Sequence, residues 1–192
     1  MNSANPDLLG PSQRRALLGL ARQSIEHGLS YGRAMAVDPT GYSAELRAQR
    51  ATFVTLETHG TLRGCIGHLE AIAPLVRDVA DNAFAAAFRD PRFPPLRPAE
   101  LPHLAIEISV LSVPQPLSFA SEAELLAKIE PGVDGLILED GSAHGTFLPT
   151  VWRSLPEPRD FLRHLKTKAG LSPDYWSDGM RIQRYRTESF AE

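Results

Sequence analysis

Two stretches of this 192-residue chain each read as a pair of β-prone runs joined by a short glycine-containing turn. The first is ATFVTLETHGTLRGCIG, residues 51–67, and the second is GVDGLILEDGSAHGTFLP, residues 132–149. Each predicts a β-hairpin, with His59–Gly60 and Asp140–Gly141 at the turns. Hairpins that alternate with helices do not form regular βαβ units. We therefore predict an α+β fold with a largely antiparallel sheet flanked by helices.

Apolar residues at helical spacing predict helices over residues 12–28, 74–90 and 158–170. Ser12 is expected to cap the first helix and Gly28 to end it. A capping box formed by Ser121 and Glu124 predicts one more short helix. Further strands are predicted at residues 103–113 and 180–190.

Composition excludes several classes of function. The formal net charge is −3, which argues against a dedicated nucleic-acid binder. No run approaches ~18 consecutive apolar residues, so no membrane span is expected. The first residues lack a basic start followed by an apolar run, so no secretory signal is expected. Together with a lone cysteine, these features predict a cytoplasmic protein, with a tail at residues 1–11 and one domain at 12–190.

Five segments carry a family resemblance. LRGCIG begins at Leu62, DPRFPPL at Asp90, DGLILEDG at Asp134, FLPTVW at Phe147 and FLRHLKTKAGL at Phe161. In this order the chain resembles the AMMECR domain family over residues 12–190, nearly its whole length. Bacterial and archaeal members of that family are called AmmeMemoRadiSam system protein A.

The resemblance implies an α+β fold with a main sheet and a smaller lobe. It also implies association with a Memo-like protein and a radical SAM protein, the other named members of that system. Many relatives carry a second cysteine where this chain has Lys166, so a redox pair with Cys65 is not expected.

Cys65 is the only cysteine in the chain, and its role has two interpretations. A free cysteine is among the most buried residue types, so Cys65 can be a small apolar residue in a tight strand. Two glycines inside a strand pattern suggest a bulge, or a place where another group approaches the backbone closely. As an alternative to a packed cysteine, Gly64 and Gly67 open the backbone so that its N–H groups face a ligand, and Arg63 favours the thiolate. Cys65 then acts as a nucleophile or covalent carrier.

A catalytic thiol also needs a proton acceptor nearby. His68 lies three residues after Cys65, but in a regular strand it faces the opposite side. Glu107 is expected on the polar face of its strand, where it either meets solvent or lines a cleft. His59 in the first turn and His144 in the second hairpin are further candidates for the proton acceptor, and the sequence does not decide among these groups.

The proline-rich segment after residue 89 supplies the remaining candidate residues. Asp90 and Arg92 flank a proline and either pair locally or, with Arg63, bind a small anionic substrate. Phe93 and Leu96 are expected to be buried anchors that keep the segment ordered.

Common cofactor motifs are missing. The sequence has no HExxH and no paired CxxC, so no protein-bound metal is expected, and no GxGxxG or GxxxxGK[ST] predicts a nucleotide cradle. We therefore expect no cofactor. The first functional hypothesis is an enzyme that uses Cys65 beside an arginine-lined anion site. The alternative is a non-enzymatic adaptor that binds Memo-like and radical SAM partners.

Overall fold

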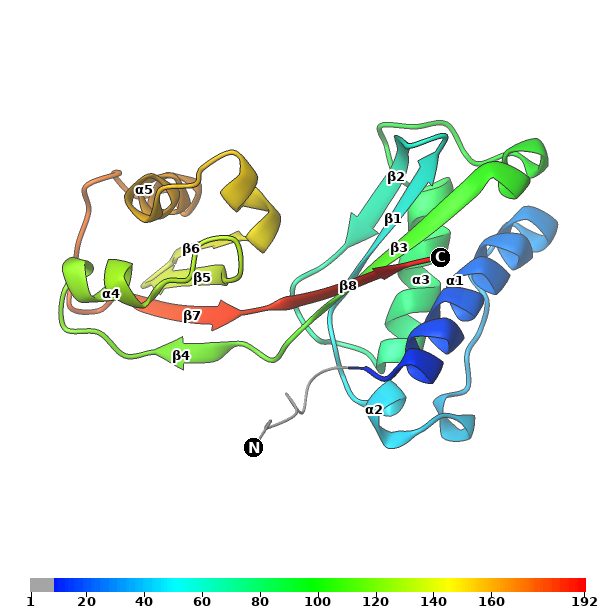
Figure 1. The fold of residues 1–192 in the computed structure, drawn as a ribbon, viewed down its shortest axis with the longest axis horizontal. Coiled ribbons are helices and arrows are strands. Elements are labelled where there is room, and N and C mark those ends of the chain that lie inside the picture. Colours follow the sequence, from blue (N-terminus) through cyan, green and yellow to red (C-terminus); the bar gives the residue numbers. More distant parts are fainter. Residues whose placement is uncertain (1–8) are drawn as a thin grey trace. The chain divides into compact units, whose positions relative to one another are not determined.

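The computed structural model describes residues 9–192, which form two compact units. The first unit comprises the chain up to Leu111 together with Glu188–Glu192, and the second comprises Ser112–Thr187. Each unit contains one four-stranded sheet (Figure 1). The fold is α+β, as predicted, and the pairs β1–β2, β1–β3, β4–β7, β5–β6 and β5–β7 are antiparallel.

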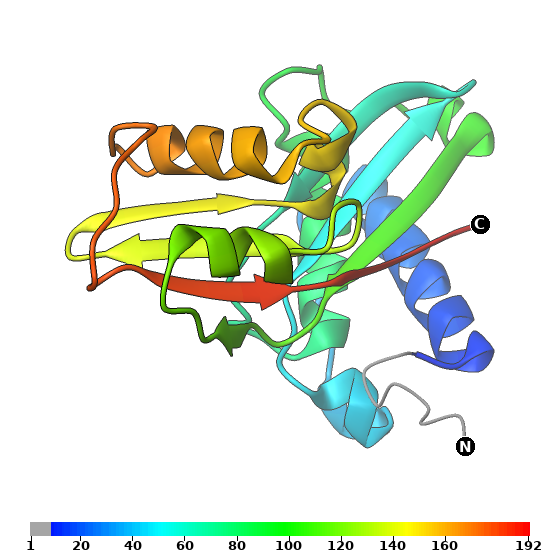
Figure 2. The ribbon, with the colours of Figure 1, turned by 60° about the vertical axis from the view of Figure 1, so that its left-hand side comes forward.

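The first unit has the sheet order β2-β1-β3-β8, with α1 and α3 on one face of the sheet (Figures 1 and 2). Apolar residues at every second strand position meet these helices, as with Val54, Leu56, Ile106 and Ile108, which are fully buried. This alternation is what makes one sheet face the core. Its elements are α1 (Pro11–Tyr31), η1 (Pro39–Gly41), α2 (Ala44–Arg47), β1 (Thr52–Thr58), β2 (Thr61–Gly67), α3 (Leu75–Phe88), η2 (Pro98–His103), β3 (Leu104–Leu111) and β8 (Thr187–Ala191).

Helix α1 differs from its prediction at both ends. Gly10, not Ser12, is the N-cap, and its N–H donates to the Gln13 side chain at 2.7 Å. The helix continues through Gly28 and ends at Tyr31, with Gly32 as its C-cap at a φ of 66°. Gly28 is needed for packing, because an added Cβ would lie 2.4 Å from the Phe88 ring of α3. A glycine that permits close helix packing has the same sequence signature as one that ends a helix.

The predicted first hairpin is confirmed as β1 and β2. His59 and Gly60 both have positive φ, 54° and 73°, as a two-residue hairpin turn of type I′ requires. The register changes between Leu56 and Glu57, which pair with Gly64 and Leu62. Arg63 is therefore an extra residue in β2, a β-bulge of the kind that the two glycines suggested.

The second unit has the sheet order β4-β7-β5-β6, and α5 packs against β6 (Figure 2). Its core centres on the Trp152 indole, which stacks on Phe161 at a centroid distance of 3.7 Å. The indole N–H donates to the carbonyl of Asp134 at 2.7 Å. The elements are β4 (Gln115–Leu117), α4 (Glu122–Lys128), β5 (Gly135–Asp140), β6 (Ala143–Phe147), η3 (Pro149–Arg153), α5 (Pro158–Lys168) and β7 (Arg181–Tyr185).

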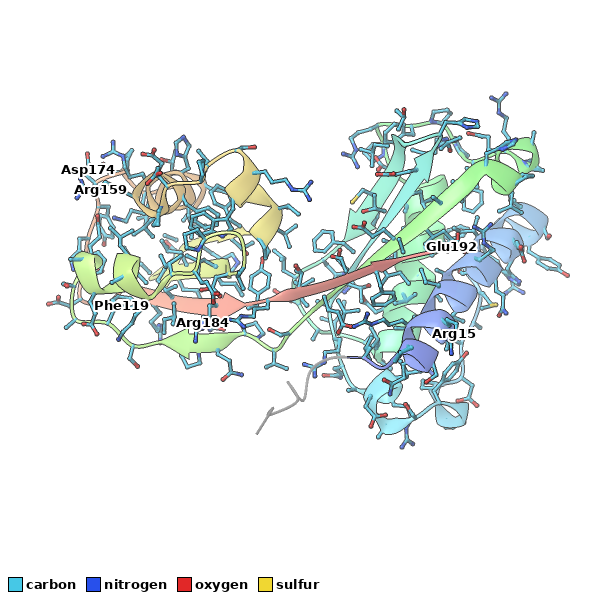
Figure 3. All side chains as sticks on the ribbon, viewed as in Figure 1. Arg15, Phe119, Arg159, Asp174, Arg184 and Glu192 are labelled. Atoms are coloured by element: carbon cyan, nitrogen blue, oxygen red, sulfur yellow. The ribbon has the colours of Figure 1, made fainter. Side chains whose placement is uncertain are left out.

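The predicted closing strand at 180–190 is two strands, β7 and β8, which belong to the two different sheets. The break falls at Arg186, whose N–H donates to the Ser112 hydroxyl and whose carbonyl accepts the Ser112 N–H at 2.8 Å. Beyond the break, Glu192, which is labelled in Figure 3, forms an ion pair with Arg22 of α1. The period-two pattern runs through both strands, so the sequence alone reads them as one.

Candidate functional site

Cys65 lies on β2, an edge strand of the first sheet, and side chains pair with its backbone beyond that edge. Its N–H donates to Oδ2 of Asp90 at 2.9 Å, and its carbonyl accepts Nη2 of Arg92 at 3.1 Å. These two bonds replace those that a further strand would make. The predicted local pairing of Asp90 with Arg92 is present, and it closes the open sheet edge at the cysteine.

Asp90 is the buried charge of this arrangement, with a side chain only 1% exposed. It accepts Nε and Nη2 of Arg92 at 2.9 and 2.7 Å. The Arg92 guanidinium, with the N–H groups of Cys65 and Arg92, holds the pKa of Asp90 well below its usual range. Asp90 in turn raises the pKa of Arg92, with a smaller contribution from Cys65. Arg92 is 53% exposed, so its outer face still reaches solvent.

The thiol of Cys65 points to the sheet face that α1 and α3 do not cover. Its cross-strand neighbour is Thr55, whose hydroxyl donates to Sγ at 3.4 Å. Thr55 in turn lies opposite Glu107 on β3, and the Glu107 side chain is exposed. The three residues form one row across three strands, which we call the Cys65–Thr55–Glu107 row. The prediction that Glu107 lies on the polar face of its strand is confirmed.

Thr55 and Cys65 approach closely because of the sheet geometry. The Cys65 backbone groups point outward to Asp90 and Arg92, so this cross-strand pair lacks mutual backbone bonds. Side chains are closer in such pairs than in hydrogen-bonded ones. Cys65 is half-buried, and its sulfur contacts the Thr55 hydroxyl.

The bulge turns the Arg63 side chain away from the Cys65 thiol, and its guanidinium pairs with other groups. Its Nε donates to Glu100 at 2.7 Å and its Nη2 to the carbonyl of Pro94 at 2.9 Å. The Arg63 guanidinium lowers the pKa of Glu100 to about 2. The expected influence of Arg63 on the thiol has no support in these contacts, and its charge is balanced by Glu100.

Phe93 lies between the two arginines. The guanidinium carbon of Arg63 is 5.9 Å from the ring centroid and that of Arg92 is 5.5 Å away. The ring is half-buried, so the prediction that Phe93 is buried was wrong: arginine side chains cover it where apolar ones were expected. Leu96 is buried, as predicted, and anchors the segment to the core.

Gly64 and Gly67 are packing glycines. A Cβ on Gly64 would lie 2.2 Å from the carbonyl oxygen of Ala86 in α3. A Cβ on Gly67 would lie 2.3 Å from the carbonyl oxygen of Thr52 and 2.5 Å from the Phe53 ring. The prediction that these glycines mark a close backbone approach holds, with α3 and β1 as the neighbours.

His68 faces α3 and not the thiol. Its Nε2 is 2.6 Å from Oδ1 of Asp78, although the ring is not aligned for a hydrogen bond. Asp78 also accepts the Thr52 hydroxyl at 2.6 Å and the Asn82 amide at 3.0 Å. Burial raises the pKa of Asp78 against the opposing effect of these partners. His68 belongs to this polar cluster and is not a base for Cys65.

Lys166, the residue in place of the second cysteine, has a fully buried side chain in the second unit. Its Nζ donates to Glu122 at 2.6 Å and lies 5.7 Å from the centroid of the Trp176 ring. Trp176 and Phe119 also help line a hollow of 440 Å³ beside β4 and β7. Figure 3 shows Phe119 near these strands. This hollow contains none of the predicted site residues.

Within residues 9–192, which the structure describes, no group of three or more histidine, cysteine, aspartate or glutamate side chains is arranged to hold a metal ion. In the same part of the chain, no helix has the length and apolar content that crossing a membrane requires.

Several residues of the site escaped the sequence reasoning. Thr55 is an ordinary strand threonine until the register sets it beside Cys65. Glu100 comes from a proline-rich turn 37 residues from Arg63. Thr52, Asp78 and Asn82 meet only because α3 packs against β1. The spacing of Asp78 and Asn82 at i and i+4 on one helix face was the only available signal.

Comparison with known proteins accords with this fold. A protein from Methanothermobacter thermautotrophicus is 39% identical over 190 residues, covering 96% of each chain, and one from Thermococcus gammatolerans is 40% identical over 187 residues. The crystal structure of the uncharacterized protein PH0010 from Pyrococcus horikoshii matches with a TM-score of 0.76 and 36% identity, covering 92% of this chain and 90% of that one. The family model described as AMMECR1 matches residues 18–190. The chain belongs to the AMMECR1 family.

Proposed function

We propose that this protein is a thiol-dependent enzyme or covalent carrier whose nucleophile is Cys65. The observation that supports this most is the Cys65–Thr55–Glu107 row on the helix-free face of the first sheet. It offers a half-buried thiol, a hydroxyl at 3.4 Å from Sγ, and an exposed carboxylate opposite that hydroxyl. Thiol catalysis needs a nucleophile with a proton acceptor in reach.

In this proposal Glu107 accepts the thiol proton through Thr55, whose hydroxyl rotates to accept from S–H and donate to the carboxylate, or through a bridging water. The resulting thiolate adds to a carbonyl carbon of a small substrate. The C–S bond forms as the C=O π bond breaks, and its electron pair passes to the carbonyl oxygen, which takes the proton back from Glu107. Arg92, whose guanidinium is exposed on one side, is the residue that would contact an anionic group of that substrate. Arg63 is not assigned to anion binding, because its charge is already neutralised by Glu100. A cytoplasmic location suits a thiol that must stay reduced.

Alkylation of the single cysteine tests the proposal directly, since every label must lie on Cys65. The folded protein should react with iodoacetamide at pH 7 faster than N-acetylcysteine does. Thr55→Val and Glu107→Gln should each slow the reaction, because each breaks the path from sulfur to carboxylate. Glu57→Gln, which changes an exposed carboxylate two residues along β1, is the matched control and should leave the rate unchanged.

Labelling that requires unfolding would overturn the enzymatic proposal. If wild type, Thr55→Val and Glu107→Gln are alkylated at equal rates, Glu107 is not the proton acceptor of Cys65. Intact-mass spectrometry at several times gives the rates, and circular dichroism establishes that each variant is folded.

A second candidate is an adaptor that binds the Memo-like and radical SAM proteins implied by the resemblance. Two large apolar side chains near Cys65 in sequence favour it: Leu62 on β2 is 40% exposed and Ile72 is 68% exposed. Exposed apolar side chains of this size are common at protein interfaces. Leu62→Ser with Ile72→Ser should abolish co-purification with those partners, whereas Cys65→Ala should not. Normal co-purification of the double variant would contradict this candidate.

A further inference from the structure

We propose that His59 and His103 form a two-histidine site for a transition-metal ion that prefers imidazole ligands, such as Zn²⁺. His59 lies in the β1–β2 turn and His103 directly precedes β3, so both belong to the same end of the first sheet, which Figure 1 shows as a ribbon. Their centroids are 5.0 Å apart and their planes differ by 34°.

The sheet register creates this pair. Thr58 on β1 pairs with Leu104 on β3, so the next residues outward, His59 and His103, are cross-strand neighbours. They are 44 positions apart in the sequence, which is why no linear metal motif reveals them. A cross-strand pair has its Cβ atoms about 5 Å apart, which is close enough for two imidazoles to share a ligand.

The ring separation fits chelation. With a metal–nitrogen distance of about 2.1 Å and about 1.1 Å from nitrogen to ring centroid, two imidazoles on one tetrahedral ion have centroids about 5 Å apart. The observed centroid distance of 5.0 Å matches this separation. Both side chains are exposed, and among the described residues neither ring makes a hydrogen bond or ion pair that metal binding would break.

His59 is the one residue other than glycine with positive φ among those described, in a turn that favours asparagine, aspartate or glycine. Histidine also adopts this conformation more readily than most residues, so the turn accepts it. Its imidazole is the commonest metal ligand in proteins and binds zinc, copper and nickel well.

The site supplies two protein ligands, since the described residues hold no group of three. Water or a donor from another molecule would complete the coordination, as in zinc sites that keep an open position. Mg²⁺ and Ca²⁺ prefer oxygen ligands and should not bind here.

Isothermal titration of the metal-free protein with ZnCl₂ tests this. Wild type should bind one Zn²⁺, and MgCl₂ should give no signal. His59→Asn keeps a residue that suits the turn, and His103→Gln keeps side-chain length. Each should weaken Zn²⁺ binding about tenfold or more, because the second ligand then loses its high effective concentration.

Two controls make the result specific. His144→Gln changes another exposed hairpin histidine, which lies 3.8 Å from a Glu139 oxygen, and should bind Zn²⁺ like wild type. Cys65→Ala should also bind normally, which excludes the thiol as the ligand. Unchanged binding in folded His59→Asn and His103→Gln, no binding by wild type, or loss of binding in either control would overturn the proposal. Thermal melts of each variant identify any that fails to fold.

Discussion

The Asp90 carboxylate binds the backbone N–H of Cys65 at 2.9 Å from a segment 25 residues further along the chain. The same carboxylate holds Arg92, which returns to the Cys65 carbonyl. The two signature segments LRGCIG and DPRFPPL are thus one structural unit. Their shared task is to close the edge of β2 at the cysteine, which fixes where the thiol points.

Asp90→Asn should lower the free energy of unfolding at pH 7 by about 2 kcal/mol, because it removes one partner of a buried ion pair. The folded-state pKa of Asp90 lies below its unfolded value. Its stabilising effect is therefore complete above the unfolded pKa, about 4, and is lost as the pH falls through the folded pKa. The difference in stability between wild type and Asp90→Asn should shrink between about pH 5 and pH 2.

Urea denaturation across this pH range measures that difference. Asp78 acts in the opposite sense, because burial raises its pKa and its protonation on acidification restores stability. The comparison with Asp90→Asn cancels the Asp78 contribution, which both proteins share. A difference that stays constant with pH would mean that the Asp90 charge contributes nothing.

Cys65→Ser should cost less than about 1 kcal/mol in stability, because Thr55 can hydrogen-bond the new hydroxyl. Cys65→Ala leaves the Thr55 hydroxyl without that partner and should be no more stable than Cys65→Ser. Thermal melts of both variants give the comparison. If the alanine variant proves clearly more stable than the serine variant, the thiol is a packed apolar group and the enzymatic proposal loses its basis.

Gly64→Ala should destabilise the protein by about 3 kcal/mol or more, since its Cβ would meet backbone atoms of Ala86 that cannot move aside. Gly19→Ala is the matched control. Gly19 is exposed inside α1 with no atom near an added Cβ, so alanine there should stabilise by about 0.5–1 kcal/mol. Urea denaturation of both variants should show changes of opposite sign; equal changes would contradict the packing of α3 against Gly64.

Glu122→Gln should destabilise more than Lys166→Met, although both remove the same ion pair. Glu122→Gln leaves the fully buried Lys166 ammonium without a carboxylate, at a cost of about 2 kcal/mol. Lys166→Met replaces the ammonium with an apolar chain of similar length and should be near neutral, because the Trp176 contact is kept. Melting temperatures in the reverse order would show that the lysine charge itself stabilises the second unit.

The local elements follow from local patterns. The β-prone pattern and turn residues of ATFVTLETHGTLRGCIG predicted the first hairpin and its turn, because side-chain direction in a strand has a period of two. The same rule located Glu107 on the polar face of β3. The two glycines around Cys65 suggested a bulge or a close backbone approach. The structure has both, with Arg63 as the extra residue of the bulge and close neighbours at Gly64 and Gly67.

Contacts between distant segments were decided by the tertiary structure alone. The sequence could not assign the 180–190 stretch to two sheets, or say that Arg63 turns to Glu100 while Arg92 stays at Cys65. It offered His68 as a base, yet α3 brings Asp78 to that ring, and it gave no sign that His59 and His103 meet. Local pattern fixes which way a side chain leaves its own strand or helix. Which groups that side chain contacts depends on strand register and on packing between segments tens of residues apart. The sequence of one such segment does not specify which other segment it will pack against.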